Sequence, residues 1–220
     1  IENTNPYHAP GFCEGSAWQF TWYVPHDVKS LINLIGERQF IDRLNAGFAT
    51  SEKVSFNALG DNMGAYPINH GNETNMQAAY LFSYTSEPWH TQKWARAIQE
   101  KYYGMGPRDA YPGDEDQGQM SSWYILSSIG LFQMDGGCSK DPVWLLGSPR
   151  FDRVEILLDN TYYSGKKLII KAENVSKDNC YIQYVRFNNK RLSNNYIEWS
   201  KLKKGGTLHF IMGDRPNPNA

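Results

Sequence analysis

The sequence has few cysteines, no long apolar run and no excess of charge of either sign. Its three cysteines, Cys13, Cys138 and Cys180, are scattered without metal-ligand spacing. We therefore expect buried, inert thiols and neither a disulfide framework nor a zinc site. The formal net charge of -1, with acids and bases mixed along the chain, argues against nucleic acid or an anionic membrane as the main partner. No apolar run is long enough to cross a bilayer, so no membrane insertion is expected.

The chain begins at Ile1, with neither an initiator Met nor a signal peptide after it. We therefore expect it to be part of a longer protein or a processed product. Its 220 residues are enough for one large domain or two smaller ones.

Aromatic residues are abundant, with 7 Trp, 14 Tyr and 10 Phe. One segment, "FCEGSAWQFTWYVPHD", mixes large aromatic side chains with polar groups. They are Phe12, Trp18, Phe20, Trp22 and Tyr23. Many aromatic residues must belong to the core, but this density also suits a cleft that offers flat apolar faces beside hydrogen-bonding groups.

The pattern of apolar residues changes near residue 140. Before it the spacing is helical: Val28, Leu31, Ile32 and Ile35 recur at i, i+3, i+4 and i+7, and Phe40, Ile41, Leu44 and Phe48 do the same after Gly36. Residues 75–103 predict two helices interrupted at Glu87-Pro88, and a further helix is expected from about Gln119 to Leu131.

After residue 140 the segments are short and rich in β-formers, namely "RVEILL", "KLIIKA", "CYIQYVRF" and "TLHFIM". Turns such as "NNK" and "KKGG" separate them. The sequence therefore predicts an α+β fold, with helical hairpins over residues 1–140 followed by an antiparallel sheet over residues 141–220.

Three adjacent acids, Asp114, Glu115 and Asp116, lie just before the expected helix at Gln119. A calcium loop of the EF-hand type is excluded, because its sixth and twelfth positions, Gly and Glu, are Gln119 and Ile125 here. Asp116 and Gln119 have the spacing of a capping box, so the simpler interpretation is a helix cap. The functional alternative keeps the cap and adds chemistry, since a carboxylate at a helix N-terminus tends to stay ionised and can act as a general base.

A second acid, Glu14, lies between Gly11 and Gly15 in the aromatic segment. In an apolar setting its pKa would be raised, which is the condition for a general acid. A solvent-exposed loop residue is the ordinary alternative for a lone Glu.

A third polar cluster, "NHGNET", precedes another expected helix. His70, Asn72 and Glu73 are residue types that bind hard cations or hydroxyl groups. Alternatively, Thr74 or Asn75 caps the helix and the rest is loop. Two carboxylate centres, an aromatic cleft and oxygen ligands together suggest glycoside hydrolysis.

Several motifs closely resemble the glycoside hydrolase family 92 exo-α-mannosidases. They are "EGSAWQFTWYVPHDV", "HGNE", "PWHTQKWARAI", "YPGDEDQGQMSSWYILSSIGLF", "LLGSPRFDRVEI" and "GGTLHFIMGDRPN". The resemblance runs in order from near Gly11 to the C-terminus and covers only the C-terminal part of such enzymes, which carry a β-sandwich domain upstream. It implies that residues 1–140 are the last hairpins of an (α/α)6 toroid and that residues 141–220 are a β-rich region packed on it.

The resemblance also implies roles. Family members are calcium-dependent inverting enzymes that remove terminal α-linked mannose from N-glycans and related mannosides. Glu14 matches the general acid, and Asp116 the general base with Asp114 as its close partner. Gln19 and Glu73 look like the residues of the calcium site. Trp18, His70 and Asn72 are the expected substrate-binding residues.

Family habit further implies export, to a periplasm or beyond, and an upstream part of the same enzyme as a partner. One departure concerns linkage preference: where many members have Pro and then His after the Asn-Glu pair, this chain has Thr74 and Gln77. Two other functions stay open: an inactive fragment or glycan-binding module, and another toroidal enzyme with a different sugar, such as a glucosidase. Calcium dependence, mannose preference and turnover of this chain separate these possibilities.

Overall fold

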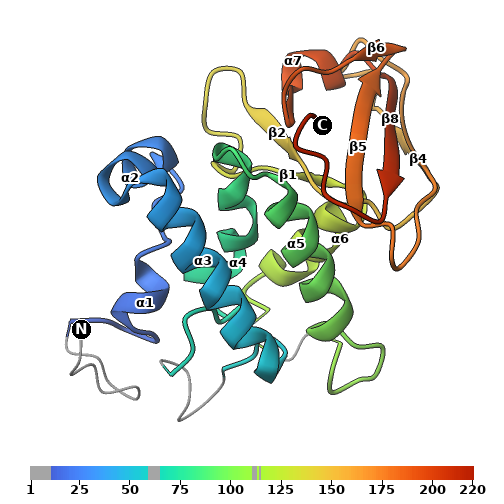
Figure 1. Cartoon of the computed structure of the whole chain (residues 1–220). Helices are drawn as coiled ribbons and strands as arrows, with labels where there is room; N and C mark the ends of the chain where they lie inside the picture. The colour runs from blue at the N-terminus through green and yellow to red at the C-terminus, as the bar shows by residue number, and fades with distance from the viewer. Residues whose placement is uncertain (1–10, 59–64, 111–112, 114) are drawn as a thin grey trace.

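The computed structural model describes residues 11–58, 65–110, 113 and 115–220. Helices make up the first part of the chain and strands the second, so the fold is α+β as predicted (Figure 1). Asp114, one of the predicted catalytic acids, lies outside the described residues.

The helical part follows the predicted apolar spacing closely. Its elements are α1 (Ala17–Phe20), α2 (Val28–Ile35), α3 (Glu37–Ser51), η1 (Glu52–Val54), α4 (Glu73–Met76), η3 (Ala78–Tyr84), α5 (Trp89–Lys101) and α6 (Gln119–Ser128). In α3 the four expected apolar residues, Phe40 to Phe48, are all buried. The predicted break before Pro88 is also confirmed, because α5 begins directly after it.

Two helix predictions were wrong in extent. The segment from residue 75 is not one α-helix: α4 ends at Met76, and η3 is a 3-10 helix. Residues 78–83 are buried all round, so packing on every side, and not one amphipathic face, decides their conformation. The last helix ends at Ser128 instead of Leu131, because Gly130 takes a left-handed φ of +82° and Leu131 starts a strand.

The β-rich part contains two sheets. One has the order β1 (Leu131–Phe132), β2 (Val143–Leu146), β7 (Tyr196–Glu198), and the other the order β3 (Arg153–Leu157), β4 (Lys167–Glu173), β8 (Gly206–Gly213), β5 (Tyr181–Phe187), β6 (Lys190–Arg191). The helix α7 (Trp199–Leu202) lies between β7 and β8 in the chain. The four predicted strand segments are confirmed. The sheet is not wholly antiparallel, however, because β4 and β8 pair in parallel, with Leu168 opposite Gly206.

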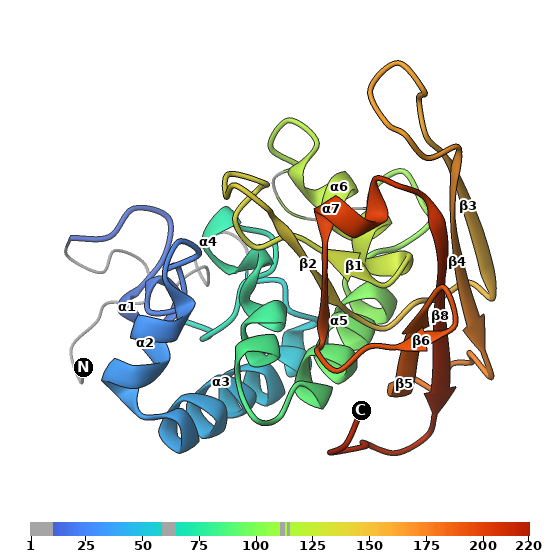
Figure 2. The same ribbon diagram turned by 90° about the horizontal axis from the view of Figure 1, so that it is seen from above.

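The two parts pack directly on each other. Helix α5 lies between α3 and the five-stranded sheet, and it contacts β5 (Figures 1 and 2). The Gln92 side chain on α5 accepts a hydrogen bond from the Ile182 backbone N–H at 2.8 Å. The Arg96 guanidinium on the same helix donates to Ser148 and Pro149 at the start of the β-rich part.

The expectation of buried cysteines was wrong for two of the three. Cys13 and Cys138 are exposed on loops, and only Cys180 is partly covered. Within the described parts of the chain, none of the helices has the length and apolar character needed to cross a membrane.

Candidate active site

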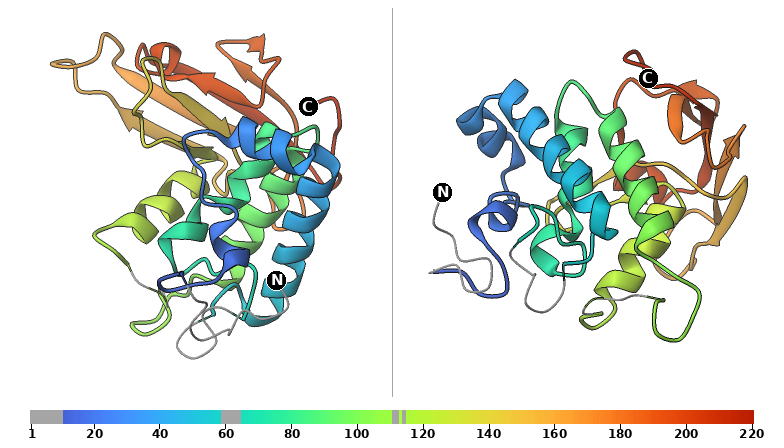
Figure 3. Two further views of the ribbon diagram at one scale, coloured as in Figure 1. Left: turned by 90° about the vertical axis from the view of Figure 1, so that its left-hand side faces the viewer. Right: turned by 60° about the horizontal axis from the view of Figure 1, so that its bottom comes forward.

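Three short loops that carry the predicted site residues each lead into a helix. The loop with Glu14 precedes α1, the loop 69–72 precedes α4, and the loop 113–118 precedes α6. Helix α4 contacts both α1 and α6, and the three helices form a row in the left view of Figure 3. The fold thus brings together segments that are up to 100 residues apart in the sequence.

Direct contacts join these loops. The Asn72 side-chain amide donates to the backbone oxygen of Glu14 at 2.6 Å. The backbones of Gly71 and Gly113 touch: a Cβ added to Gly71 would lie 3.1 Å from the Gly113 Cα and 2.5 Å from the Tyr102 hydroxyl oxygen. Only glycine at both positions allows this close approach. We call the loop 69–72 the central loop. The loop that carries Glu14 and the loop that carries Asp116, called the aspartate loop below, are both held to it.

Of the three predicted catalytic carboxylates, the two that the structure describes, Glu14 and Asp116, are both exposed. Glu14 has a left-handed φ of +52° and Asp116 one of +46°. Non-glycine residues adopt this conformation at a cost of about 1 kcal/mol or more, and it is concentrated at functional sites. The expected apolar surroundings of Glu14 are absent among the described residues, because its side chain faces solvent. The nearby rings of the segment do not enclose it.

Asp116 does not cap α6, so the capping prediction was wrong. The N-cap position belongs to Gly118, whose φ is +95°, and Glu115 performs the cap instead. Its carboxylate accepts from the Gly118 N–H at 2.5 Å and from the Ser121 hydroxyl at 2.6 Å and N–H at 3.2 Å. The Ser121 hydroxyl bond, followed by the Gly118 N–H bond, lowers the pKa of Glu115. This arrangement leaves the Asp116 side chain outside the cap.

Glu115 was missed because a capping residue is expected directly before the helix, whereas Glu115 lies four residues before Gln119. From there its carboxylate accepts from Gly118, three residues later, and from Ser121, six residues later. The signal available in the sequence was Gly118 itself, since a glycine directly before a helix has no side chain to cap it and another group must do so.

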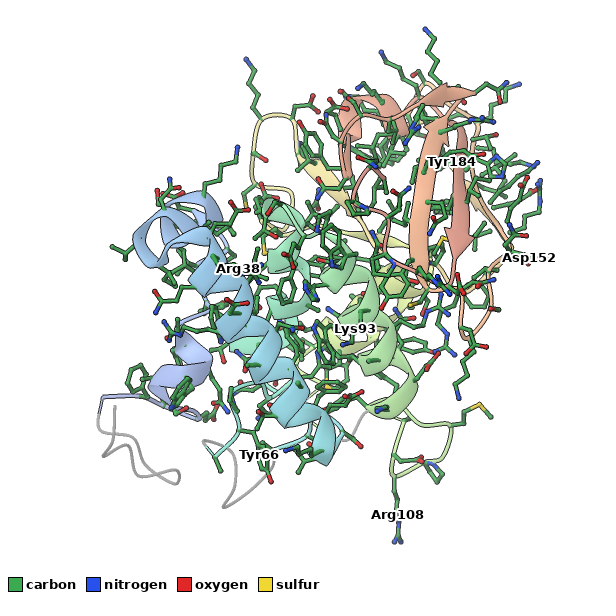
Figure 4. The ribbon with its side chains drawn as sticks, viewed as in Figure 1. Arg38, Tyr66, Lys93, Arg108, Asp152 and Tyr184 are labelled. Carbon is green, nitrogen blue, oxygen red and sulfur yellow. The ribbon has the colours of Figure 1, made fainter. Side chains whose placement is uncertain are left out.

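The two predicted calcium residues differ in their surroundings. Gln19 is buried; its Nε2 donates to the Tyr66 carbonyl at 2.9 Å, and its Oε1 accepts from the Ser16 N–H at 3.3 Å in a capping box around α1. Glu73 is partly buried at the start of α4, and no bond of its carboxylate is recorded among the described residues. Tyr66, labelled in Figure 4, belongs to the segment that precedes the central loop.

Calcium takes about six to eight oxygen ligands. Among the described residues no group of three or more His, Cys, Asp or Glu side chains is placed to hold a metal ion. The carboxylate of Glu73 has the right chemistry for one or two of these ligands, and the side-chain oxygen of Gln19 for one more. The roles of Gln19 and Glu73 as calcium ligands remain predictions.

The predicted substrate-binding residues do not share one environment. Trp18 is 40% exposed and has the Arg43 guanidinium 6.0 Å from its ring centroid, so part of its face is open. Asn72 is buried, with 4% of its surface exposed. Its side-chain oxygen also accepts from the Glu73 N–H at 2.8 Å and forms the N-cap of α4. The cap of this helix is therefore Asn72, and neither Thr74 nor Asn75 as predicted.

His70 belongs to the central loop, and its side chain is fully buried. Its Nε2 lies 2.8 Å from the Tyr103 hydroxyl, and its ring packs edge-on against Trp123 at a centroid distance of 4.3 Å. The role of His70 as a substrate-binding residue stays a prediction. Its place in the packing indicates that it holds the central loop against α6.

Burial lowers the pKa of His70 from its usual 6.5 to about 3. The unfolded chain therefore takes up a proton on His70 as the pH falls below about 6.5, and the folded chain does not. Stability is lost as the pH falls from the unfolded pKa toward the folded one, by about 2 kcal/mol between pH 7 and pH 5. We expect a His70→Gln variant, which keeps a hydrogen-bonding group for Tyr103, to lose this part of the pH dependence.

Urea unfolding at pH 5 and pH 7 measures this difference, with the exposed His26→Gln as a matched control that leaves it unchanged. An unaltered pH dependence in His70→Gln would show that His70 is not buried in the neutral form.

A cavity of about 340 Å³ lies between α4 and α6 next to Glu73. Its lining mixes aromatic, amide and hydroxyl side chains, as a carbohydrate site requires. The residues are Tyr23, Pro25, Glu73, Met76, Gln77, Gln119, Ser122, Trp123, Leu126, Phe132, Gln133, Met134 and Gly136. The exposed ring of Tyr23 thus belongs to a cavity, as predicted for the aromatic segment, whereas Trp22 of the same segment is part of the core.

Acidic loops joined at helix N-termini, beside a cavity of aromatic and amide groups, are features of the glycoside hydrolase class. Comparison with known proteins identifies the family. The chain belongs to glycosyl hydrolase family 92, because the family model for the catalytic domain matches residues 1–214.

Solved structures agree with this assignment. The family GH92 α-mannosidase BT3965 from Bacteroides thetaiotaomicron, in complex with mannoimidazole, is 32% identical with a TM-score of 0.82, over 98% of this chain and 28% of that one. The inverting mannosidase BT2199 from the same organism is 33% identical with a TM-score of 0.79, over 94% of this chain and 28% of that one.

A curated relative, an uncharacterized secreted glycosidase of Arthroderma benhamiae, is 29% identical over 91% of this chain and 23% of its own length. The chain thus spans about a quarter of the length of the proteins it matches.

Proposed function

We propose that the chain is the C-terminal part of the catalytic region of a calcium-dependent, inverting exo-α-mannosidase. Its substrates are terminal α-mannosides of N-glycans or mannans, with α-1,2 linkages as the first to test. The observation that carries this proposal is the junction of loops at Gly71, where the Glu14 loop and the aspartate loop meet one central loop. The complex of the BT3965 α-mannosidase with mannoimidazole supports mannose as the sugar.

In the proposed mechanism Glu14 donates a proton to the glycosidic oxygen as the bond to the leaving group breaks. Asp116, with Asp114 beside it, accepts a proton from the water that attacks the opposite face of the sugar. Inversion requires the two carboxyl groups to lie about 6.5–9.5 Å apart, so that a water molecule fits between the base and the sugar. Both side chains are exposed in this chain, as substrate access demands.

The helices would form the last hairpins of an (α/α)6 toroid, completed by upstream chain. Exposed apolar side chains support this need for a further part: Leu34 is 85% exposed and Ile125 60%. The same observation favours the second candidate function, a fragment that is inactive or only binds glycans without its upstream half. Export to a periplasm or to the outside of the cell is proposed from the secreted fungal relative.

Calcium would be held by Glu73, with Gln19 as a further oxygen ligand and the remaining oxygens supplied by other parts of the protein, the sugar or water. Its chemistry is to bind sugar hydroxyl groups and stabilise charge in a distorted ring. We expect Glu73→Gln to weaken the apparent calcium affinity by about tenfold or more, because one charged ligand is lost.

The calcium-dependent rise in melting temperature of the upstream-extended protein measures this, with mannose release as a second readout. Glu52→Gln, which removes a surface carboxylate paired with Lys101, is the matched control. Equal calcium affinity in Glu73→Gln and the parent would remove Glu73 from the proposed site.

The test of the function is mannose release from α-1,2-mannobiose by this chain and by an upstream-extended chain, each with calcium and with a chelator. Calcium-dependent release by either chain supports the enzyme. Release by the extended chain alone assigns the 220 residues to an incomplete site, and glucose release from α-glucosides in place of mannose release would favour the other toroidal enzyme.

A further inference from the structure

A second cavity, of about 490 Å³, lies on the other side of α5 and α6, where the helical part meets the β-rich part. Positively charged side chains outnumber negatively charged ones in its lining. It consists of Arg96, Gln99, Glu100, Tyr103, Gly104, Met105, Tyr124, Arg150, Ser176 and Lys177. None of the predicted catalytic or calcium residues is among them, so this cavity is separate from the candidate active site.

Arg96 brings a positive charge into the interior, and within the described parts of the chain it forms no ion pair with a carboxylate. It is 5% exposed, and its guanidinium donates only to neutral acceptors: the Ser176 carbonyl at 3.0 Å, the Ser148 hydroxyl at 2.9 Å and the Pro149 carbonyl at 2.5 Å. Burial lowers the pKa of this guanidinium. A buried cation with neutral partners alone has lost much of its hydration, and a nearby anion would restore favourable interactions.

Cys180 does not provide that anion. It is the largest favourable electrostatic neighbour of Arg96, but burial raises the pKa of its thiol. The thiol is therefore neutral at pH 7. Glu100, on the same helix, also raises the pKa of Arg96, but the two side chains form no ion pair.

Two donors at this place lack an acceptor in the described part of the chain. They are the Nε of Arg96 and the side-chain Nε2 of Gln99, which is 1% exposed and whose oxygen already accepts from Ser128. Arg96 and Gln99 are one turn apart on α5, so both side chains extend from the same face of the helix. Because both free groups are donors, the complementary ligand must be an acceptor.

Two further cations line the cavity. Arg150 donates to the Gln99 carbonyl at 3.3 Å, and no bond of Lys177 is recorded. Within the described ranges, neither Arg150 nor Lys177 has a carboxylate within 4.0 Å. Glu100 is the single acidic side chain of the lining, so three cations face one carboxylate.

We propose that this cavity binds a small oxyanion of the phosphate or sulfate type. Four groups recognise it: the guanidinium groups of Arg96 and Arg150, the amide of Gln99 and the ammonium of Lys177. A planar guanidinium suits an oxyanion because it can present two parallel N–H donors. Water alone would satisfy the two donors but would leave the excess positive charge unbalanced.

The experiment titrates the 220-residue chain with inorganic phosphate at constant ionic strength, with sodium chloride withdrawn as phosphate is added. Heat of binding and the rise in melting temperature are both recorded. Saturable binding is expected, and Arg150→Gln and Lys177→Gln are each expected to weaken it by about tenfold, the effect of removing one charge-assisted bond. Lys177→Gln breaks no recorded hydrogen bond, so it separates binding from folding.

Matched controls remove the same charge elsewhere. Arg108→Gln replaces an arginine that projects from a loop into solvent (Figure 4). Lys140→Gln replaces an exposed lysine. Both variants should bind phosphate like the parent. Absence of saturable binding, or equal weakening in cavity variants and controls, would overturn the proposal. No mannoside or calcium is present, so the result is independent of the proposed hydrolase activity.

Discussion

Replacing Asp116 with Asn in the upstream-extended enzyme is expected to lower mannose release from α-1,2-mannobiose by about 10²–10⁴-fold, the usual contribution of a general base. Asparagine has nearly the same size and keeps a hydrogen-bonding oxygen, but it cannot accept the proton of the attacking water. The side chain lies outside the helix cap, which Glu115 forms, so the substitution should leave the start of α6 intact. Initial rates of mannose release under saturating calcium measure the effect.

The predicted acid can be distinguished from the base by the leaving group. Glu14→Gln should be as slow as Asp116→Asn on the disaccharide, whose departing hydroxyl needs a proton. With a dinitrophenyl α-mannoside, whose leaving group departs without protonation, Glu14→Gln should recover most of the rate and Asp116→Asn should not.

Asp42→Asn provides the control for both, because Asp42 is an exposed partner of Arg38 on α3 and lies in none of the three loops. Near-parental rates for Asp116→Asn on the disaccharide would remove Asp116 as the base. Equal recovery of both variants on the activated substrate would contradict the separate roles of the two carboxylates.

Trp123→Ala is expected to cost about 3–5 kcal/mol of the free energy of unfolding, the usual loss for a buried aromatic side chain. Trp123 is 2% exposed on α6, where its ring stacks on Tyr103 at 5.8 Å and meets His70 at 4.3 Å. Its indole N–H has no partner among the described residues, so the loss reports packing and not a broken hydrogen bond. The alanine would leave a void directly under the central loop.

Urea unfolding at pH 7 measures this cost, and Trp123→Phe is the matched variant, expected to lose about half as much because most of the ring contacts remain. Since the central loop holds both acidic loops, Trp123→Ala should also slow mannose release by the extended enzyme. A loss of stability below about 1 kcal/mol in Trp123→Ala would mean that the ring is not packed against His70 as described.

Much of the secondary structure was predictable from local patterns. The apolar spacing from Val28 to Phe48 predicted α2 and α3 because a single face of each helix is buried, and the β-rich segments predicted the four main strands. Predictions failed where packing overrides local preference. Residues 78–83 are buried on all sides and form a 3-10 helix, and β8 pairs with β4 in parallel although β5, β6 and β7 come between them in the chain.

The candidate site was likewise predictable only in part from the sequence. Motifs in the sequence identified Glu14, Asp116, Asn72 and Glu73 as a set, and the family was recognisable from them. The sequence alone did not indicate that Glu115 is the actual cap of α6, since it lies four residues before the first residue of the helix.

The sequence by itself determined the family of this protein, its helical and strand segments and the identity of its acidic loops, because these depend on local spacing and residue type. Only the tertiary structure decided that Gly71 and Gly113 touch, that the His70 side chain is buried and that three cations and one carboxylate line the second cavity. The physical reason is that burial, close approach and unbalanced charge are properties of pairs of residues. The pairs Gly71–Gly113 and His70–Tyr103 are 33 or more residues apart, and no local pattern encodes their distance.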